Sequence, residues 1–312
     1  MPNTHPDIPP LRQAFTHFPN IGPVRLKMLL EAGIRSWEDI GPFPPPELHA
    51  WNAFWSPIYQ TAIECREADA ANDIQFFIEH LAPQDRWRLL HKHWPQCAFL
   101  DIETSGLDFD ADITVISVFY QHQVQLFVKD ENIDDFPDFL LTLPFIVTYN
   151  GSTFDIPKIT RFFNLPPRPV PHIDLRWLCQ RLDLTGGLKP IEQMLGIIRP
   201  QDLQGTDGDD AIQLWQQWQA FHAPYARYLL MKYCAADTLS LELVTDRILE
   251  QHGFPVAARP QQAQIWSALE QISKPDRPAV EPSAVQPVQE EQTTIASLQN
   301  RLKDFLNKKR HH

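Results

Sequence analysis

One short apolar run carries two acids, and it restricts the fold of this chain more than any other segment. Residues 97–104 read Cys-Ala-Phe-Leu-Asp-Ile-Glu-Thr, and a turn of small residues follows. Side chains alternate between the two faces of a β-strand, so Asp101 and Glu103 would share one face. Leu100 and Ile102 would then face a packed core. Because two neighbouring carboxylates repel each other unless a cation lies between them, the run predicts a strand that presents acids to a metal ion.

Residues 95–254 alternate strand-like and helix-like patterns, which indicates an α/β fold. Several strands come first, and strands and helices then alternate, as expected for a mixed sheet with helices on its faces. The expected strands are 97–104, 113–121, 123–129, 145–150 and 172–175. The expected helices are 133–143, 155–163, 176–182, 189–195, 210–221 and 226–251.

Composition and pattern divide the chain into five segments. Residues 1–60 hold short helical patterns broken by prolines, residues 61–94 form a helical connector, and residues 95–254 form the main domain. Residues 255–292 contain six prolines among Gln, Ala, Glu and Val, a composition that predicts a disordered linker. Residues 293–312 regain helical spacing and include a Lys-Lys-Arg cluster, so a basic amphipathic tail helix is expected.

The first segment resembles a helix-hairpin-helix module. Residues 15–23 read Phe-Thr-His-Phe-Pro-Asn-Ile-Gly-Pro and precede a predicted helix at 24–32 that ends at Gly33. In such a motif the hairpin offers backbone amides to a phosphate, which reads the nucleic-acid backbone and not its sequence. A purely structural hairpin stays open, because the segment is nearly charge-neutral and a single motif binds weakly. The residues expected to contact a DNA backbone are Asn20, Ile21, Gly22, Arg25 and Lys27.

Composition also narrows the class of protein. The 312 residues are 43% hydrophobic, enough for one sizeable α/β core and a small accessory module. No apolar stretch reaches membrane-spanning length and no signal-peptide pattern follows Met1, so we expect a cytoplasmic protein without membrane contact. Four cysteines without a Cys-x-x-Cys pair favour reduced thiols over disulfides or zinc. The net charge of −12 argues against bulk electrostatic binding of nucleic acid, but it is compatible with acids that hold metal ions.

Two later acids lie in contexts that are ambiguous when each is taken alone. Asp155 follows a strand and a turn of small residues that begins after Asn150, and it opens a helix. An aspartate at that position also serves as an ordinary N-cap. Tyr233 and Asp237 are spaced i, i+4 and share one face of a long helix, where an aspartate is equally at home on a solvated surface. Each acid therefore has a purely structural alternative.

The order of the three segments is far more specific than any one of them. D-x-E on a first strand, N-x(4)-D after a later strand and Y-x(3)-D on a late helix resemble the three motifs of the DnaQ-like, DEDD-type exonucleases of ribonuclease-H fold. The histidine subclass would need a histidine where this chain has Lys232, so the resemblance is to the tyrosine subclass. Over about residues 70–250 the chain is similar to the bacterial YprB-type exonuclease family. The segments that carry this similarity are 73–90, 99–107, 149–157, 172–175 and 198–215.

This resemblance implies a ribonuclease-H-like, metal-dependent 3′→5′ exonuclease. Two divalent ions, Mg²⁺ or Mn²⁺, would be held by the four acids, with Asp101 bridging both. Tyr233 would orient the attacking water, since its unperturbed pKa of about 10 makes it a poor base. The implied catalytic residues are Asp101, Glu103, Asp155, Asp237 and Tyr233.

The resemblance also implies a set of substrate contacts around these acids. Two residues have structural alternatives: Lys189 as a solvated lysine at a helix start, and Asp174, which resembles a family position, as a strand-end cap. The implied substrate contacts are Thr104, Ser105, Gly106, Leu107, Asn150, Phe154 and Lys189.

Three functions stay open on sequence alone. The first is an exonuclease acting on a nucleic acid with a free 3′ end, and the hairpin module favours single-stranded DNA over RNA as the substrate. The second is a non-catalytic nucleic-acid-binding adaptor that keeps the fold without the reaction. The third is an endonuclease or ribonuclease of the same fold.

Two short patterns beyond the main domain add smaller expectations. Residues 265–272 form an apolar, helix-like patch inside the expected linker. Gln299, Leu302, Phe305 and Leu306 are spaced like a sliding-clamp peptide, a helix-in-groove mode of binding. The alternative for this tail is a basic helix that touches DNA or packs on its own domain.

Overall fold

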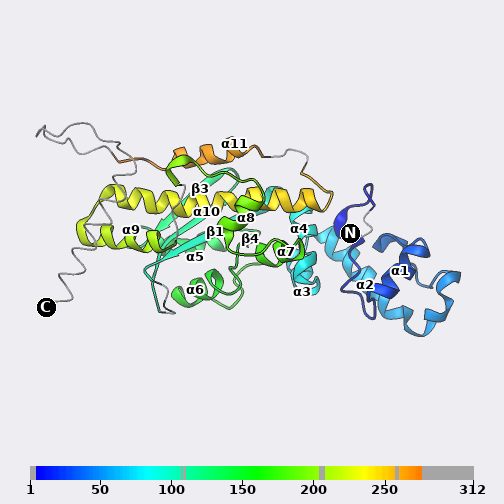
Figure 1. Ribbon diagram of the computed structural model, residues 1–312. Coiled ribbons are helices and arrows are strands. Elements are labelled where there is room, and N and C mark those ends of the chain that lie inside the picture. The colour runs from blue at the N-terminus through cyan, green and yellow to red at the C-terminus, as the bar shows by residue number, and fades with distance from the viewer. Residues whose placement is uncertain (1–4, 107, 109, 204–207, 257–259, 276–312) are drawn as a thin grey trace, which may run out of the picture.

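The structure is a computed structural model of the chain (Figure 1). It describes residues 5–106, 108, 110–203, 208–256 and 260–275. The expected tail helix at 293–312, with its clamp-like pattern, lies outside the described residues, as does Leu107. Among the described helices, none combines the length and the apolar character that crossing a bilayer requires.

A five-stranded mixed sheet forms the centre of the main domain, in the order β3-β2-β1-β4-β5. β1 pairs antiparallel with β2, and β2 pairs antiparallel with β3. β4 and β5 continue the sheet in parallel from β1. The mixed sheet expected from the sequence is therefore confirmed. The strands are β1 (Cys97–Thr104), β2 (Ile113–Tyr120), β3 (Gln123–Val128), β4 (Phe145–Thr148) and β5 (His172–Asp174).

The two faces of the sheet pack against different hydrophobic cores. Successive side chains of β1 alternate between these two cores. Ala98, Leu100 and Ile102 belong to the core under α5 (Phe136–Leu140) and α6 (Asp155–Phe162). Cys97 and Phe99 belong to the larger core on the opposite face. Asp101 and Glu103 continue this second set by the strand period of two. The face that carries the acids is the one covered by α10 (Pro224–Gln251) (Figure 1).

The helix α10 lies along the sheet and is buried on most of its circumference. Pro224 occupies its first turn, where the missing amide hydrogen costs nothing, and Gly253 just beyond its end has the left-handed φ of 82°. The other helices of the domain are α7 (Leu175–Arg181), α8 (Leu188–Met194) and α9 (Gly208–Phe221).

The N-terminal part, residues 5–96, contains helices only. Its second long helix, α2, runs without a break across the expected boundary between residues 60 and 61, so the module and the connector share one helix. After Ile34 the chain forms the short 3-10 helix η2. The elements are η1 (Pro10–Gln13), α1 (Pro23–Glu31), η2 (Trp37–Asp39), η3 (Pro46–Trp51), α2 (Asn52–Ala71), α3 (Ile74–His80), η4 (Pro83–Asp85), α4 (Trp87–Lys92) and η5 (Trp94–Gln96).

A buried aspartate fastens this N-terminal part together. Asp69, at the end of α2, is 8% exposed and accepts hydrogen bonds from Arg12 and from Lys92 of α4. Arg88 of α4 donates to the carbonyl oxygen of Pro10 at 2.6 Å. A buried charge is tolerated only when it is paired in this way. The contacts hold the first residues against α4, which precedes η5 and β1.

Residues 260–275 of the expected linker contain helices, and they include the helix-like patch predicted at 265–272. These residues form α11 (Gln262–Trp266) and the 3-10 helix η8 (Ser267–Gln271). Ile265 and Leu269 are each 4% exposed. The side chain of Gln262 bonds both the amide of Ile198 and the carbonyl of Gly196. Burial of the apolar patch stabilises the folded segment, and this outweighs the tendency of the flanking prolines to favour disorder.

Candidate active site

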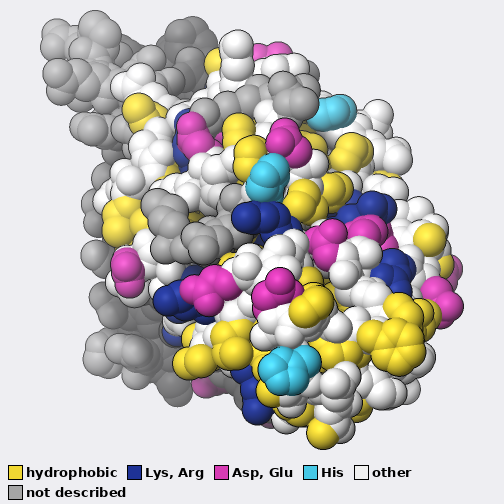
Figure 2. Space-filling view, turned by 90° about the vertical axis from the view of Figure 1, so that its right-hand side faces the viewer, with side chains coloured by type: hydrophobic (Ala, Val, Ile, Leu, Met, Phe, Trp, Pro, Cys, Tyr) yellow, Lys and Arg dark blue, Asp and Glu magenta, His cyan; other side chains and the backbone are white. Residues whose placement is uncertain are grey.

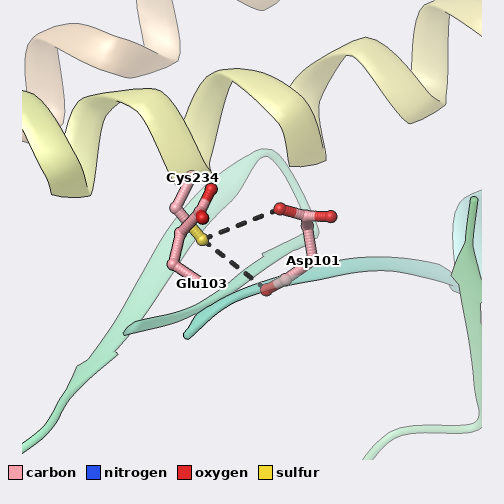
Figure 3. A group of neighbouring side chains, drawn as sticks. All are labelled: Asp101, Glu103 and Cys234. Atoms are coloured by element: carbon pink, nitrogen blue, oxygen red, sulfur yellow. Dashed lines mark hydrogen bonds between the residues drawn. The ribbon is translucent and has the colours of Figure 1, made fainter. Parts of the chain in front are cut away.

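The first two acids lie side by side at the C-terminal half of β1, beneath α10 (Figure 3). Asp101, Glu103 and the thiol of Cys234 each place one potential ligand atom within 4.8 Å of the other two. Cys234 donates to the backbone oxygen of Asp101 at 3.6 Å and approaches its carboxylate at 3.9 Å. Burial raises the pKa of Cys234 well above its usual range, so the sulfur is a neutral thiol beside the acids. The sequence analysis missed this neighbour, although it follows Tyr233 directly.

Several polar groups in the turn after β1 form hydrogen bonds with other residues of the same turn. The pairing of β1 with β2 shifts register between Glu103 and Thr104. Thr104 donates its hydroxyl to the carbonyl of Gly106 at 2.7 Å, and the amide of Ser105 donates to Asp112 at 2.9 Å. The amide of Ser105, one of the implied substrate contacts, is thus engaged within the protein.

Asp155 reaches β1 from a tight turn after β4. The turn needs Gly151, because a Cβ there would lie 2.1 Å from the hydroxyl oxygen of Thr148. Asp155 is the first residue of α6, and the N-cap position belongs to Phe154, so the N-cap alternative is wrong. Burial raises the pKa of Asp155 to about 7, while hydrogen bonds from the backbone of Asp155 itself and of Ile102 lower it. The bond to Ile102 brings this carboxylate to the part of β1 that carries the two acids.

Asp174 has the cap role that the sequence analysis kept as an alternative. Its carboxylate accepts the amides of Asn150 at 2.8 Å, Ser152 at 3.0 Å and Arg176 at 3.0 Å. Asn150 has the left-handed φ of 64°, and its side chain accepts hydrogen bonds from Thr153 and Arg176. These bonds hold the turn that delivers Asp155. Phe154 is half-buried, with the Lys158 ammonium 5.6 Å from its ring centre.

Asp237 lies on the face of α10 that looks at the sheet, and a buried arginine neutralises it. Arg199 is 8% exposed and forms an ion pair with Asp237. The same guanidinium grips Glu192 of α8 through two hydrogen bonds of 2.7 and 2.6 Å. Burial by itself lowers the pKa of Arg199, but the carboxylates of Asp237 and Glu192 raise it by more. The net pKa is above the usual value, so Arg199 keeps its charge. Sequence reasoning gave Arg199 no role, and nothing in its residue type or spacing marked one.

Tyr233 is 3% exposed, one turn before Asp237. Burial raises its pKa above the ordinary value, and the nearby charges of Asp237 and Glu103 raise it further. The phenol is therefore protonated at neutral pH and is no general base. Lys189, half-buried in α8, donates to the Tyr233 hydroxyl at 2.7 Å. The solvated alternative for Lys189 is therefore wrong.

The four acids converge in space, which their mutual electrostatics show. Burial raises the pKa of Asp101 well above its usual range, and the charges of Asp237, Asp155 and Glu103 raise it further. Glu103 is affected in the same way, with Lys189 opposing the rise in pKa. Carboxylate oxygens from β1, α6 and α10 are the hard donors that Mg²⁺ and Mn²⁺ prefer, so these residues fit divalent cations.

The hairpin before α1 presents little free positive charge. Gly22 is exposed at the start of α1, whereas the side chain of Ile21 is buried, so only its backbone could be reached. Arg25 is held by the carbonyl of Asn20 at 2.8 Å and lies 4.7 Å from the ring centre of Phe54. Lys27 faces Glu31 at 3.6 Å. Figure 2 looks onto this end of the molecule, where basic and acidic side chains alternate without a single basic patch.

Comparison with known proteins identifies the fold of the main domain. Residues 98–249 match a family model described as RNase_H superfamily. This part of the chain is a ribonuclease-H-like domain. Such a domain supports a nuclease, with nucleic acid as the substrate and divalent metals as the usual cofactors.

A solved structure and the curated proteins add little to this. The family B DNA polymerase from the hyperthermophilic archaeon Pyrobaculum calidifontis is 16% identical, with a TM-score of 0.37. The similarity covers 50% of this chain and 24% of the polymerase chain, so this chain spans about a quarter of that protein. A likeness at this level says nothing about function. No curated protein matches the chain.

Proposed function

We propose that this protein is a metal-dependent 3′→5′ exonuclease of the DEDD type, tyrosine subclass, acting on single-stranded DNA. One observation carries the proposal: acids from three separate elements converge beside a protonated tyrosine in a ribonuclease-H-like domain. Neighbouring carboxylates repel each other unless a cation lies between them, so this arrangement favours divalent ions. The proposed catalytic set is Asp101, Glu103, Asp155, Asp237 and Tyr233.

In this proposal the protein supplies positions and charges. Divalent cations, when bound, would activate a water and neutralise the leaving 3′ oxygen. The four carboxylates of Asp101, Glu103, Asp155 and Asp237 would hold these cations. Tyr233 keeps its proton and orients the attacking oxygen. Arg199 forms an ion pair with the Asp237 carboxylate and so fixes its position. Asp237 is the acid that α10 contributes to the proposed metal ligands.

The N-terminal part has a supporting role in the proposal. We assign residues 1–60 to a helix-hairpin-helix module, residues 61–94 to a connector and residues 95–254 to the nuclease domain of YprB type. The exposed backbone at Asn20 and Gly22 would meet a DNA phosphate, as helix N-termini do. With its cations already engaged, this module would add weak, sequence-independent affinity.

The deciding experiment compares matched substrates that carry a label at the 3′ or the 5′ end. Single- and double-stranded DNA and RNA are incubated with Mg²⁺ or Mn²⁺, and the products are separated by size. We expect mononucleotides from the 3′ end of single-stranded DNA. Asp101→Ala should reduce the rate by at least about a thousandfold, since the acids act as one unit.

Two controls separate the alternatives. A circular single strand stays intact with an exonuclease, and nicking of the circle would favour an endonuclease of the same fold. The adaptor hypothesis predicts nucleic-acid binding without metal binding or cleavage. Activity that survives Asp101→Ala contradicts the proposal.

A further inference from the structure

The ammonium group of Lys189 lies against the hydroxyl of Tyr233. Its Nζ is 2.7 Å from the phenol oxygen and 4.7 Å from the ring centre. The two residues are 44 positions apart, on α8 and α10, so the contact exists only in the folded chain. A hydrogen bond from an ionised donor is about twice as strong as a neutral one. This contact therefore fixes the orientation of the Tyr233 hydroxyl relative to Lys189.

Contacts at the start of α8 fix the backbone position from which Lys189 reaches Tyr233. Tyr149 donates its hydroxyl to the carbonyl of Gly186 at 2.6 Å. Gly186 has the left-handed φ of 118°, and a Cβ there would lie 3.3 Å from Pro190. Gly187 is the N-cap and α8 begins at the next residue. The turn that leads into Lys189 is therefore anchored at Gly186.

The direction of the hydrogen bond follows from the chemistry of the two groups. A lysine ammonium has three donors and no acceptor. The phenol oxygen must therefore accept, and its own hydrogen is directed to another partner. The same contact withdraws electron density from the oxygen, which makes the O–H group a better donor.

We propose that Lys189 is a positioning residue that fixes the Tyr233 hydroxyl as a hydrogen-bond donor to the oxygen that attacks the phosphodiester. No proton leaves Tyr233 in this role. The inference rests on the proposed function and adds to it the group that sets the direction of the phenol. It replaces the direct contact between Lys189 and a phosphate that the sequence suggested.

A double-mutant cycle tests the proposal on 3′-labelled single-stranded DNA. The variants are Lys189→Met, Lys189→Arg, Tyr233→Phe and the double variant Lys189→Met/Tyr233→Phe. We expect Lys189→Met to lower kcat by about 10- to 100-fold with little change in KM, the range typical of groups that orient a ligand. Lys189→Arg should recover most of kcat, because it keeps a charged donor. The double variant should be no slower than Tyr233→Phe.

The contrary results are equally defined. If Lys189→Met slows Tyr233→Phe by the same factor as the wild type, or changes only KM, the lysine acts on the substrate and the proposal is wrong. Lys232→Met is the matched control, since this lysine precedes Tyr233 on α10 but pairs with Asp202. It should leave kcat unchanged.

A second readout does not depend on activity. The six tyrosines can be replaced with 3-fluorotyrosine, and the Tyr233 signal is identified by its loss in Tyr233→Phe. The fluorine shift of this signal should move in Lys189→Met and stay near the wild-type position in Lys189→Arg. An unmoved signal in Lys189→Met overturns the contact. If the wild-type protein cleaves none of the substrates, the proposed function fails while the fluorine shift still decides the contact.

Discussion

Two groups of buried acids lie along α10, and they differ in where their members come from. Asp237 meets Asp101 and Glu103 of β1, with Asp155 beside them. Further along the same helix, Glu242 and Asp246 are 5% and 1% exposed, spaced i, i+4. Burial raises the pKa of Glu242 to about 7, and the charge of Asp246 adds to the rise.

The difference teaches what distinguishes a candidate metal site from a buried pair of acids. Burial raises the pKa in both groups, so a raised pKa alone is a poor marker. In the first group the carboxylates come from three elements, and the charges of Asp237 and Asp155 raise the pKa of Asp101. Arg199 pairs with Asp237, and Lys189 lies against Tyr233. In the second, both carboxylates come from one helix face, and Arg247 lies 3.2 Å from Asp246. Carboxylates from separate elements can surround a cation, whereas two carboxylates one turn apart on a helix approach it from one side only.

The largest expected effect in this comparison is the loss of Arg199. Arg199→Met would leave Glu192, which is 3% exposed, without its bidentate partner. Breaking a buried ion pair in this way costs about 3–5 kcal/mol, because one charge stays buried and uncompensated. Urea unfolding measures the loss, and the double variant Glu192→Gln/Arg199→Met should regain part of it.

Arg247→Met is the matched control for this effect. The Arg247 side chain is 26% exposed, so its pair with Asp246 is screened by solvent. Its removal should change the free energy of unfolding by less than about 1 kcal/mol. Equal losses in Arg199→Met and Arg247→Met would remove the distinction between the two acid groups.

The next effect is stabilisation by the metal. Mg²⁺ or Mn²⁺ at a hundred times its dissociation constant should raise the free energy of unfolding by about 2.7 kcal/mol in the wild type. Asp237→Asn should lose most of this gain, and Glu242→Gln should keep all of it. Thermal unfolding with and without a chelator makes the comparison. If the metal-induced stabilisation were lost in Glu242→Gln and kept in Asp237→Asn, the metal would bind at Glu242 and Asp246, and the proposed site would be wrong.

The smallest effect concerns pH and Glu242. Because folding raises the pKa of this acid, its contribution to stability is complete below about pH 4 and is lost as the pH rises to about 7. Glu242→Gln should remove this dependence and raise the free energy of unfolding at pH 8 by about 1–2 kcal/mol. Urea unfolding of both proteins at pH 4.5 and 8 tests it. A variant less stable than the wild type at pH 8 contradicts the assignment.

Local patterns predicted the elements well where each had one strong periodicity. The strand at 97–104 and the helix at 155–163 agree with β1 and α6 to within a residue at either end. A helix-like patch was predicted at 265–272, but its packing against distant loops could not be predicted from the local pattern. The cap role of Asp174 was predicted from its position at the end of a strand, and the structure shows its carboxylate accepting three backbone amides.

The sequence by itself determined which side chains share a face. A strand period of two places Asp101 and Glu103 together, and a helix period places Tyr233 above Asp237, whatever surrounds them. Only the tertiary structure decided which charges those faces meet. Arg199, Lys189 and Cys234 reach the acids through contacts between separate elements. The physical reason is that periodicity is a property of the local backbone, whereas a charge partner is selected by packing across the sheet.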